Sequence, residues 1–163
     1  MHENRILINK LKNFENINSN FLIITLMLFG SILLAISAKV QVPFWPVPMT
    51  MQTFVIFLIG MTYSVRLSFA TVAFYLFQGA IGLPVFAAGG GVAYLVGPTA
   101  GYLYGMLFAS IFISYLANLG FSKTYFKATV SLLIGSAIIF SFGIIYLGSV
   151  SYTHLTLPTK RIV

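Results

Sequence analysis

The feature that most constrains this chain is a series of long apolar segments separated by short polar or proline-bearing breaks. Residues 21–38 (FLIITLMLFGSILLAISA) form an uninterrupted apolar run. Because an α-helix rises 1.5 Å per residue, about 20 such residues cross the hydrocarbon core of a bilayer. We therefore predict an all-α integral membrane protein. Its transmembrane bundle is expected over 21–148, with spans at about 21–38, 49–63, 67–82, 99–119 and 128–148.

The scarcity of charge supports this prediction and limits the chemistry. Only 7% of the residues are charged, whereas soluble domains carry about 25%. The chain contains no cysteine and no aspartate, and its two acidic residues are Glu3 and Glu15. The predicted spans therefore lack the carboxylates that acid–base catalysis, Mg²⁺ or Ca²⁺ sites and proton relays require.

We find no set of residues that points to catalysis. His2 and His154 lie at the two extremities, and the chain has no phosphate-binding loop motif and no zinc-binding histidine motif. We therefore predict that the protein is not an enzyme and uses no cofactor or metal. The basic residues are scattered between apolar segments, which argues against nucleic acid as a partner despite the net charge of +7.

The basic residues orient the bundle. If five helices alternate in direction, only Lys39 falls on one side, and the others before the last span fall on the opposite side. By the positive-inside rule, residues 1–20 are a cytoplasmic lead. The proline-rich break at 41–48 and the loop at 83–97 then share the outer face. The basic residues on the cytoplasmic side are Arg5, Lys10, Lys12, Arg66, Lys123 and Lys127.

The last residues differ in character from the rest. After Gly148 the chain becomes polar and rich in threonine, and Lys160 and Arg161 would lie outside, against the charge rule. The string SYTHLTLPT also resembles a translated sequencing adapter. We therefore expect residues 149–163 to be a non-native tail; the alternative is a genuine short tail.

Glycines mark two special segments. The apolar stretch at 82–98 contains Gly89, Gly90 and Gly91 in succession and carries no charge. We expect it to form a loop folded against the bundle, since glycine permits backbone conformations closed to other residues. The helix that follows begins with small residues at a spacing of four, which predicts close packing against a neighbouring helix. These small residues are Gly97, Gly101, Gly105 and Ala109.

Polar and aromatic residues near the outer face suit a small amphipathic ligand. Lys39 is a possible partner for a ligand carboxylate, or a helix-end lysine that extends to the membrane surface. Trp45 is alternatively an interfacial anchor, and Gln52 alternatively bonds a neighbouring helix. The candidate substrate-binding residues are Trp45, Thr50, Gln52, Phe86, Gly89, Gly90, Gly91, Tyr94, Thr99 and Tyr102.

Two motifs carry a resemblance to a known family. V-P-x-T-x-Q-T at 47–53 and G-P-T-x-G-Y-x-x-G at 97–105 resemble the biotin-specific substrate-binding (S) components of energy-coupling-factor transporters, the BioY family. The resemblance implies a six-helix bundle in a prokaryotic plasma membrane, with biotin held on the outer side beneath the segments at 41–50 and 83–97. It also implies two kinds of partner, a membrane coupling protein and two cytoplasmic ATPases.

The chain departs from this family in one respect. The resemblance implies a sixth helix, preceded by a segment with an acidic residue and a lysine that help to hold the ligand, and neither this helix nor this segment follows the fifth span here. We therefore interpret the chain as a five-helix fragment of the bundle and expect it to bind biotin poorly or not at all, whereas the intact parent would be the binder. Ser31, Ala35 and Ala38 on the first helix are candidates for docking to the coupling protein, with internal packing as the alternative. Other possible functions are an S component for another vitamin, a membrane-embedded enzyme and a channel-like oligomer.

Overall fold

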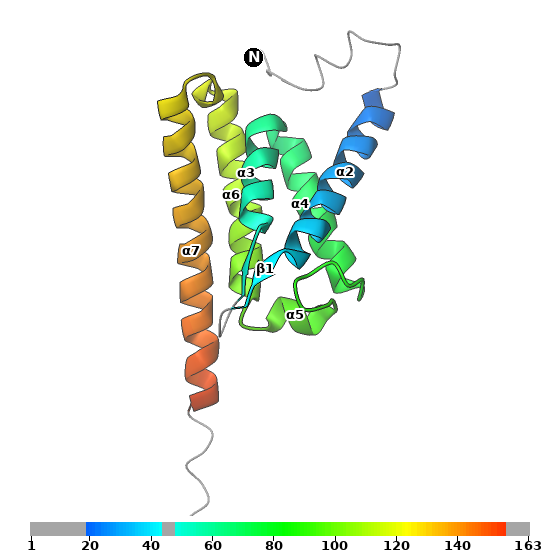
Figure 1. The fold of residues 1–163 in the computed structure, drawn as a ribbon, viewed down its shortest axis with the longest axis vertical. Helices are drawn as coiled ribbons and strands as arrows, with labels where there is room; N and C mark the ends of the chain where they lie inside the picture. The colour runs from blue at the N-terminus through cyan, green and yellow to red at the C-terminus, as the bar shows by residue number, and fades with distance from the viewer. Residues whose placement is uncertain (1–18, 44–47, 156–163) are drawn as a thin grey trace, which may run out of the picture.

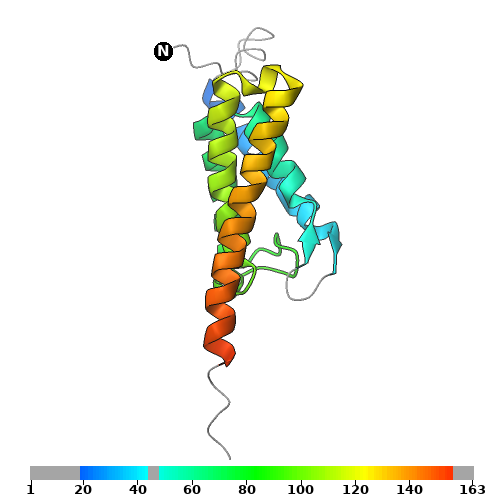
Figure 2. The same ribbon diagram turned by 90° about the vertical axis from the view of Figure 1, so that its left-hand side faces the viewer.

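The computed structural model describes residues 19–43 and 48–155, which form a bundle of helices with a small hairpin and a loop at one end (Figures 1 and 2). The two short strands pair antiparallel, with Gln41 opposite Thr50 and Val42 opposite Met49. In chain order, the elements are α2 (Ser19–Lys39), β1 (Gln41–Val42), β2 (Met49–Thr50), α3 (Gln52–Thr62), α4 (Val65–Ala80), α5 (Val92–Val96), α6 (Ala100–Asn118), the 3₁₀ helix η1 (Phe121–Lys123) and α7 (Tyr125–Leu155).

The observed helices differ in length from the expected spans. By length and composition, α2, α6 and α7 are long and apolar enough to cross a membrane. In contrast, α3 has 11 residues and α4 has 16, fewer than the roughly 20 that span a bilayer unaided. α3 begins at Gln52, because Met49 and Thr50 are paired with β1. α7 continues past Gly148 to Leu155, and residues 156–163 lie outside the described part of the chain.

The described parts of the two segments predicted to share the outer face lie at the same end of the bundle. Figure 1 shows β1 beside the glycine-containing loop (residues 83–97), which includes α5. The opposite end of the bundle is where α2 begins and where η1 joins α6 to α7. Lys39 ends α2 near the hairpin, whereas Lys123 lies in η1 at the other end. Among the described residues, Lys39 and Lys123 thus lie at opposite ends, as the predicted orientation requires, whereas Arg5, Lys10 and Lys12 lie outside the described part of the chain. The assignment of the N-terminus to the cytoplasm stays a prediction.

α6 is the central helix of the bundle, and it packs against α7, α3 and α4. α2 covers α4 and α3 on the far side, while α7 lies at the edge and contacts mainly α6 (Figure 2). Large apolar side chains on α2 and α7 point outward, and Ile145 of α7 is 73% exposed. Exposed apolar faces of this kind suit a lipid environment. The most deeply buried side chains include Leu34, Ile56, Ile59, Tyr75, Ile113 and Ile139.

Small residues of α6 allow α7 to approach closely, as predicted from their spacing. A Cβ atom at Gly105 would lie 2.9 Å from the Cα of Ile139, and one at Gly101 would collide with Tyr146. Ala109 is fully buried on the same helix. Gly97 is different, since it caps α5 and precedes the start of α6.

The candidate docking residues of α2 lie inside the bundle. Ser31 is 1% exposed and donates a hydrogen bond to the Oε1 of Gln78 over 2.7 Å. Ala38 is fully buried, and Ala35 is partly buried. This placement agrees with the internal-packing alternative, and a docking role for these residues stays a prediction.

We predict that Gly105→Ala destabilises the bundle by about 1–3 kcal/mol, because the added methyl group overpacks the α6–α7 contact. Gly148→Ala is the matched control, since a Cβ there meets no atom within 4 Å. Thermal unfolding in detergent measures the difference. Equal melting temperatures for the two variants would show that close packing at Gly105 does not stabilise the fold.

Candidate functional site

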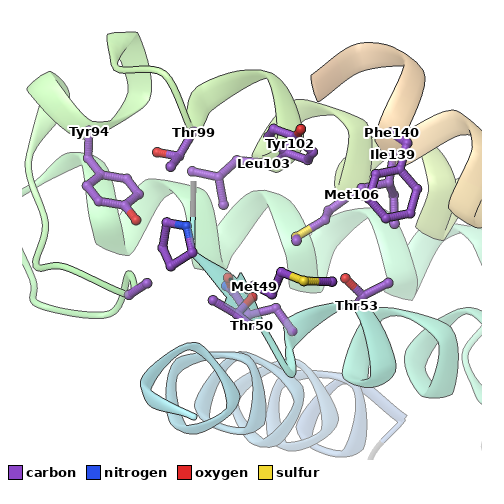
Figure 3. A pocket seen from close by; sticks show the side chains of 13 residues that line it. Met49, Thr50, Thr53, Tyr94, Thr99, Tyr102, Leu103, Met106, Ile139 and Phe140 are labelled. Carbon is purple, nitrogen blue, oxygen red and sulfur yellow. Dashed lines mark hydrogen bonds between the residues drawn. The ribbon is translucent and has the colours of Figure 1, made fainter. Parts of the chain in front are cut away.

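A cavity of ≈ 220 Å³ opens at the end of the bundle that carries the hairpin and the glycine-containing loop. This volume lies below the roughly 300–1,000 Å³ that is typical of ligand pockets. Figure 3 shows Thr99 and Tyr102 of the α6 region across the cavity from Thr50 and Thr53. The lining residues are Pro48, Met49, Thr50, Gln52, Thr53, Ala87, Tyr94, Thr99, Tyr102, Leu103, Met106, Ile139 and Phe140.

Five of the ten candidate substrate-binding residues line this cavity. They are Thr50, Gln52, Tyr94, Thr99 and Tyr102. Trp45 lies outside the described residues. The remaining four, Phe86 and Gly89 to Gly91, belong to the adjacent loop and do not line the cavity. The structure therefore places the described polar candidates around one space, whereas the loop candidates do not line it.

Gln52 and Tyr75 form a buried polar network beside the cavity. Gln52 is 4% exposed, and its Nε2 donates a hydrogen bond to the Tyr75 hydroxyl over 2.6 Å. The Tyr75 hydroxyl in turn donates to the Val85 carbonyl over 3.0 Å. Thr50 completes the network, because its Oγ1 donates to Gln52 Oε1 over 3.1 Å. Gln52 thus lines the cavity and bonds a neighbouring helix, and its role toward a substrate stays a prediction.

Backbone contacts fold the glycine-containing loop against α4. Phe86 and Gly89 exchange backbone hydrogen bonds of 2.9 and 3.3 Å, and the Gly91 amide donates to the Gly79 carbonyl over 2.7 Å. Gly89 and Gly91 have φ angles of 132° and 108°, values that side-chain-bearing residues rarely adopt. Gly90 has no such φ angle, but a Cβ there would collide with the Leu83 carbonyl group. The loop therefore requires each glycine for a backbone reason, and α5 is an additional short helix within it.

Phe86 anchors the loop to the bundle. Its side chain is fully buried, edge-on to the Tyr75 ring at 5.4 Å and stacked on the Tyr94 ring at 4.9 Å. The ring also fills the space beside Gly79, where any Cβ would collide with it. Tyr94 in turn lines the cavity. Phe86 is thus placed to support the cavity wall from behind.

Lys39 connects the end of α2 to the same loop. Its Nζ donates a hydrogen bond to the Phe86 carbonyl over 2.7 Å. The side chain is exposed and does not line the cavity, although the next loop residue, Ala87, does. A role for Lys39 toward a ligand carboxylate stays a prediction.

The cavity is suited to hydrogen bonding rather than to metal chemistry. Its polar side chains are hydroxyls and one amide, and its remaining wall is apolar. In the described ranges, no three residues of the histidine, cysteine, aspartate and glutamate types lie together as a metal site would require. The sequence did not indicate Tyr75, or Ile139 and Phe140 of α7. These residues lie in evenly apolar segments that give no signal of a site.

Comparisons with known proteins find a matching family and similar proteins. The BioY family model matches residues 10–161. A Rickettsia prowazekii protein named "Probable biotin transporter BioY" is 34% identical over 87% of this chain and 73% of its own length. A protein of the same name from Lysinibacillus sphaericus is 36% identical over 71% of this chain, which spans only 59% of that relative.

One solved structure shares the fold. It is described as the S-component for biotin from an ECF-type ABC transporter, and it matches with a TM-score of 0.74 at 25% identity. The match covers 85% of this chain and 77% of that structure. Together with the long apolar helices, this identifies an all-α membrane protein.

We predict that Gly90→Ala displaces the glycine-containing loop, because the new methyl group would clash with the backbone of Leu83. Faster amide hydrogen exchange at Phe86 and Gly89 would report the displacement, since the loop's own hydrogen bonds open. Ala88→Ser is the control, because Ala88 is exposed in the same loop. Identical exchange in both variants would contradict the close packing of Gly90.

Proposed function

The chain belongs to the BioY family, and from this premise we propose that it is the biotin-binding subunit of an uptake transporter in a prokaryotic plasma membrane. The observation that carries the proposal is the cavity beside the glycine-containing loop, where threonine hydroxyls and the Gln52 amide meet an apolar wall. Biotin as the ligand is also supported by three of the compared proteins, since two are named probable biotin transporters and one is described as an S-component for biotin.

The chemistry of biotin fits these surroundings. Its fused rings are largely apolar and suit contact with Leu103, Met106 and Ile139. Its ureido group needs both hydrogen-bond donors and acceptors, which hydroxyls and a side-chain amide supply. Its valerate carboxylate needs a cation or several converging donors. Lys39 offers a cation close to the cavity, because its Nζ bonds the Phe86 carbonyl and the next residue, Ala87, lines the cavity.

Energy for uptake must come from partner proteins in this proposal. The sequence contains no phosphate-binding loop motif for ATP. We propose a membrane coupling protein and two cytoplasmic ATPases as these partners. Biotin binds at the outer end, the segments at 41–50 and 83–97 close over it, and the subunit reorients when it docks on the coupling protein.

We predict that the chain in liposomes accumulates labelled biotin only when the coupling protein, both ATPases and ATP are present. The purified chain alone should hydrolyse no nucleotide, and any vitamin that it binds should be biotin. Thiamine serves as the control ligand of another vitamin class. Preferential binding of thiamine, or ion flux through the chain without partners, would refute the proposal.

We predict that Lys39→Met weakens biotin binding about tenfold, the loss expected when a charge-assisted hydrogen bond is removed. The affinity for biotin methyl ester should change much less, because the ester has no carboxylate charge. Lys123→Met is the matched control, since Lys123 lies at the opposite end of the bundle. An equal loss for biotin and its ester would mean that Lys39 acts only by holding the Phe86 carbonyl.

A further inference from the structure

The hydrogen bonds of Tyr75 determine which way the Gln52 amide points. A tyrosine hydroxyl has a single hydrogen atom, and that of Tyr75 is donated to the Val85 carbonyl. Toward Gln52 the same hydroxyl can therefore only accept, so the Nε2 end of the amide must face Tyr75 at 2.6 Å. Thr50 reinforces this orientation from the other side, because its hydroxyl donates to Oε1.

The fixed amide leaves a defined set of groups for a ligand. Nε2 carries two hydrogen atoms, and one of them is used on Tyr75. Oε1 has two lone pairs, and one of them accepts from Thr50. Gln52 therefore retains one donor and one acceptor. A cyclic urea also carries one donor and one acceptor on one edge, where an N–H lies beside the C=O.

Tyr75 itself lies behind the cavity. It is 2% exposed, does not line the space, and packs edge-on against the buried Phe86 ring. Its hydroxyl nevertheless joins a cavity residue on α3 to the first part of the glycine-containing loop at Val85. A change in the Gln52 amide is therefore transmitted to the loop through one buried atom.

We propose that Tyr75 is a positioning residue that orients Gln52 to recognise the ureido edge of the ligand and links this recognition to the glycine-containing loop. The inference rests on the proposed biotin site. In this proposal, Tyr75 lies outside the cavity but determines both the ligand selectivity of Gln52 and the stability of the loop.

The first test compares two ligands on the Tyr75→Phe variant. The substitution removes only the hydroxyl and retains the ring that packs on Phe86. The probes are biotin and 2-iminobiotin at neutral pH, whose cyclic guanidinium carries donors only. We expect biotin affinity to fall about tenfold, as for a lost buried hydrogen bond. The preference for biotin over 2-iminobiotin should shrink, because the freed amide can turn an acceptor toward the donor-only ligand.

The matched control is Tyr63→Phe. Tyr63 is also buried and donates to a backbone carbonyl, that of Leu26 over 2.9 Å, but it follows the opposite end of α3. This variant should keep the wild-type ratio of the two affinities. An unchanged ratio in Tyr75→Phe, or an equal change in both variants, would overturn the proposed role of Tyr75.

The second test needs no ligand. Amide hydrogen exchange of the ligand-free chain should rise several-fold at Phe86, Gly89 and Gly91 in Tyr75→Phe, since the Val85 carbonyl loses its partner. Tyr63→Phe should leave these amides unchanged. Unaltered exchange in Tyr75→Phe would refute the link to the loop. Preferential binding of another vitamin would instead refute the proposed function, while this second test still decides the link.

Discussion

The structure depends on satisfying polar groups within an apolar bundle. Neither lipid nor a packed interior supplies hydrogen bonds, so each buried donor or acceptor must find a partner in the protein. Of the buried side-chain nitrogen and oxygen atoms in the described residues, only Ser114 Oγ has no partner. The glycine-containing loop is the most demanding segment, because it is largely non-helical. Tyr75, Lys39 and the Gly79 carbonyl each pair with one of its backbone groups.

This requirement also explains the character of the site. The same polar side chains that hold the loop lie beside the cavity, so Gln52 is at once a structural partner of Tyr75 and a group available to a ligand. With no acidic side chain after Glu15, the polar side chains of the cavity wall are hydroxyls and one amide. Such groups bind a neutral ring system without the large desolvation cost of a buried charge. The cavity therefore combines polar groups with an apolar wall, which suits an amphipathic molecule.

The sequence predicted the features that follow from local patterns. Apolar length predicted the membrane helices, the spacing of Gly101 and Gly105 predicted a close helix contact, and the polar residues near one end included Gln52, which lines the cavity. Other features depend on segments far apart in the chain. Tyr75 occurs in an apolar helix and acquires its role only because Gln52 and Val85 fold next to it. The pairing of β1 with β2 likewise shortened α3, although residues 49–51 match the apolar pattern of a span.

Two separate supports determine the shape of the cavity. One wall rests on the hydrogen-bonded network from Thr50 through Gln52 to the loop. The facing wall includes Ile139 and Phe140 of α7, a helix that contacts mainly α6 and meets it where Gly105 allows Ile139 to approach. A shift of α7 along α6 would move Phe140 relative to Thr53 without breaking any bond of the network. The polar wall can therefore specify hydrogen-bonding groups while the α6–α7 contact independently sets the width available to an apolar ring.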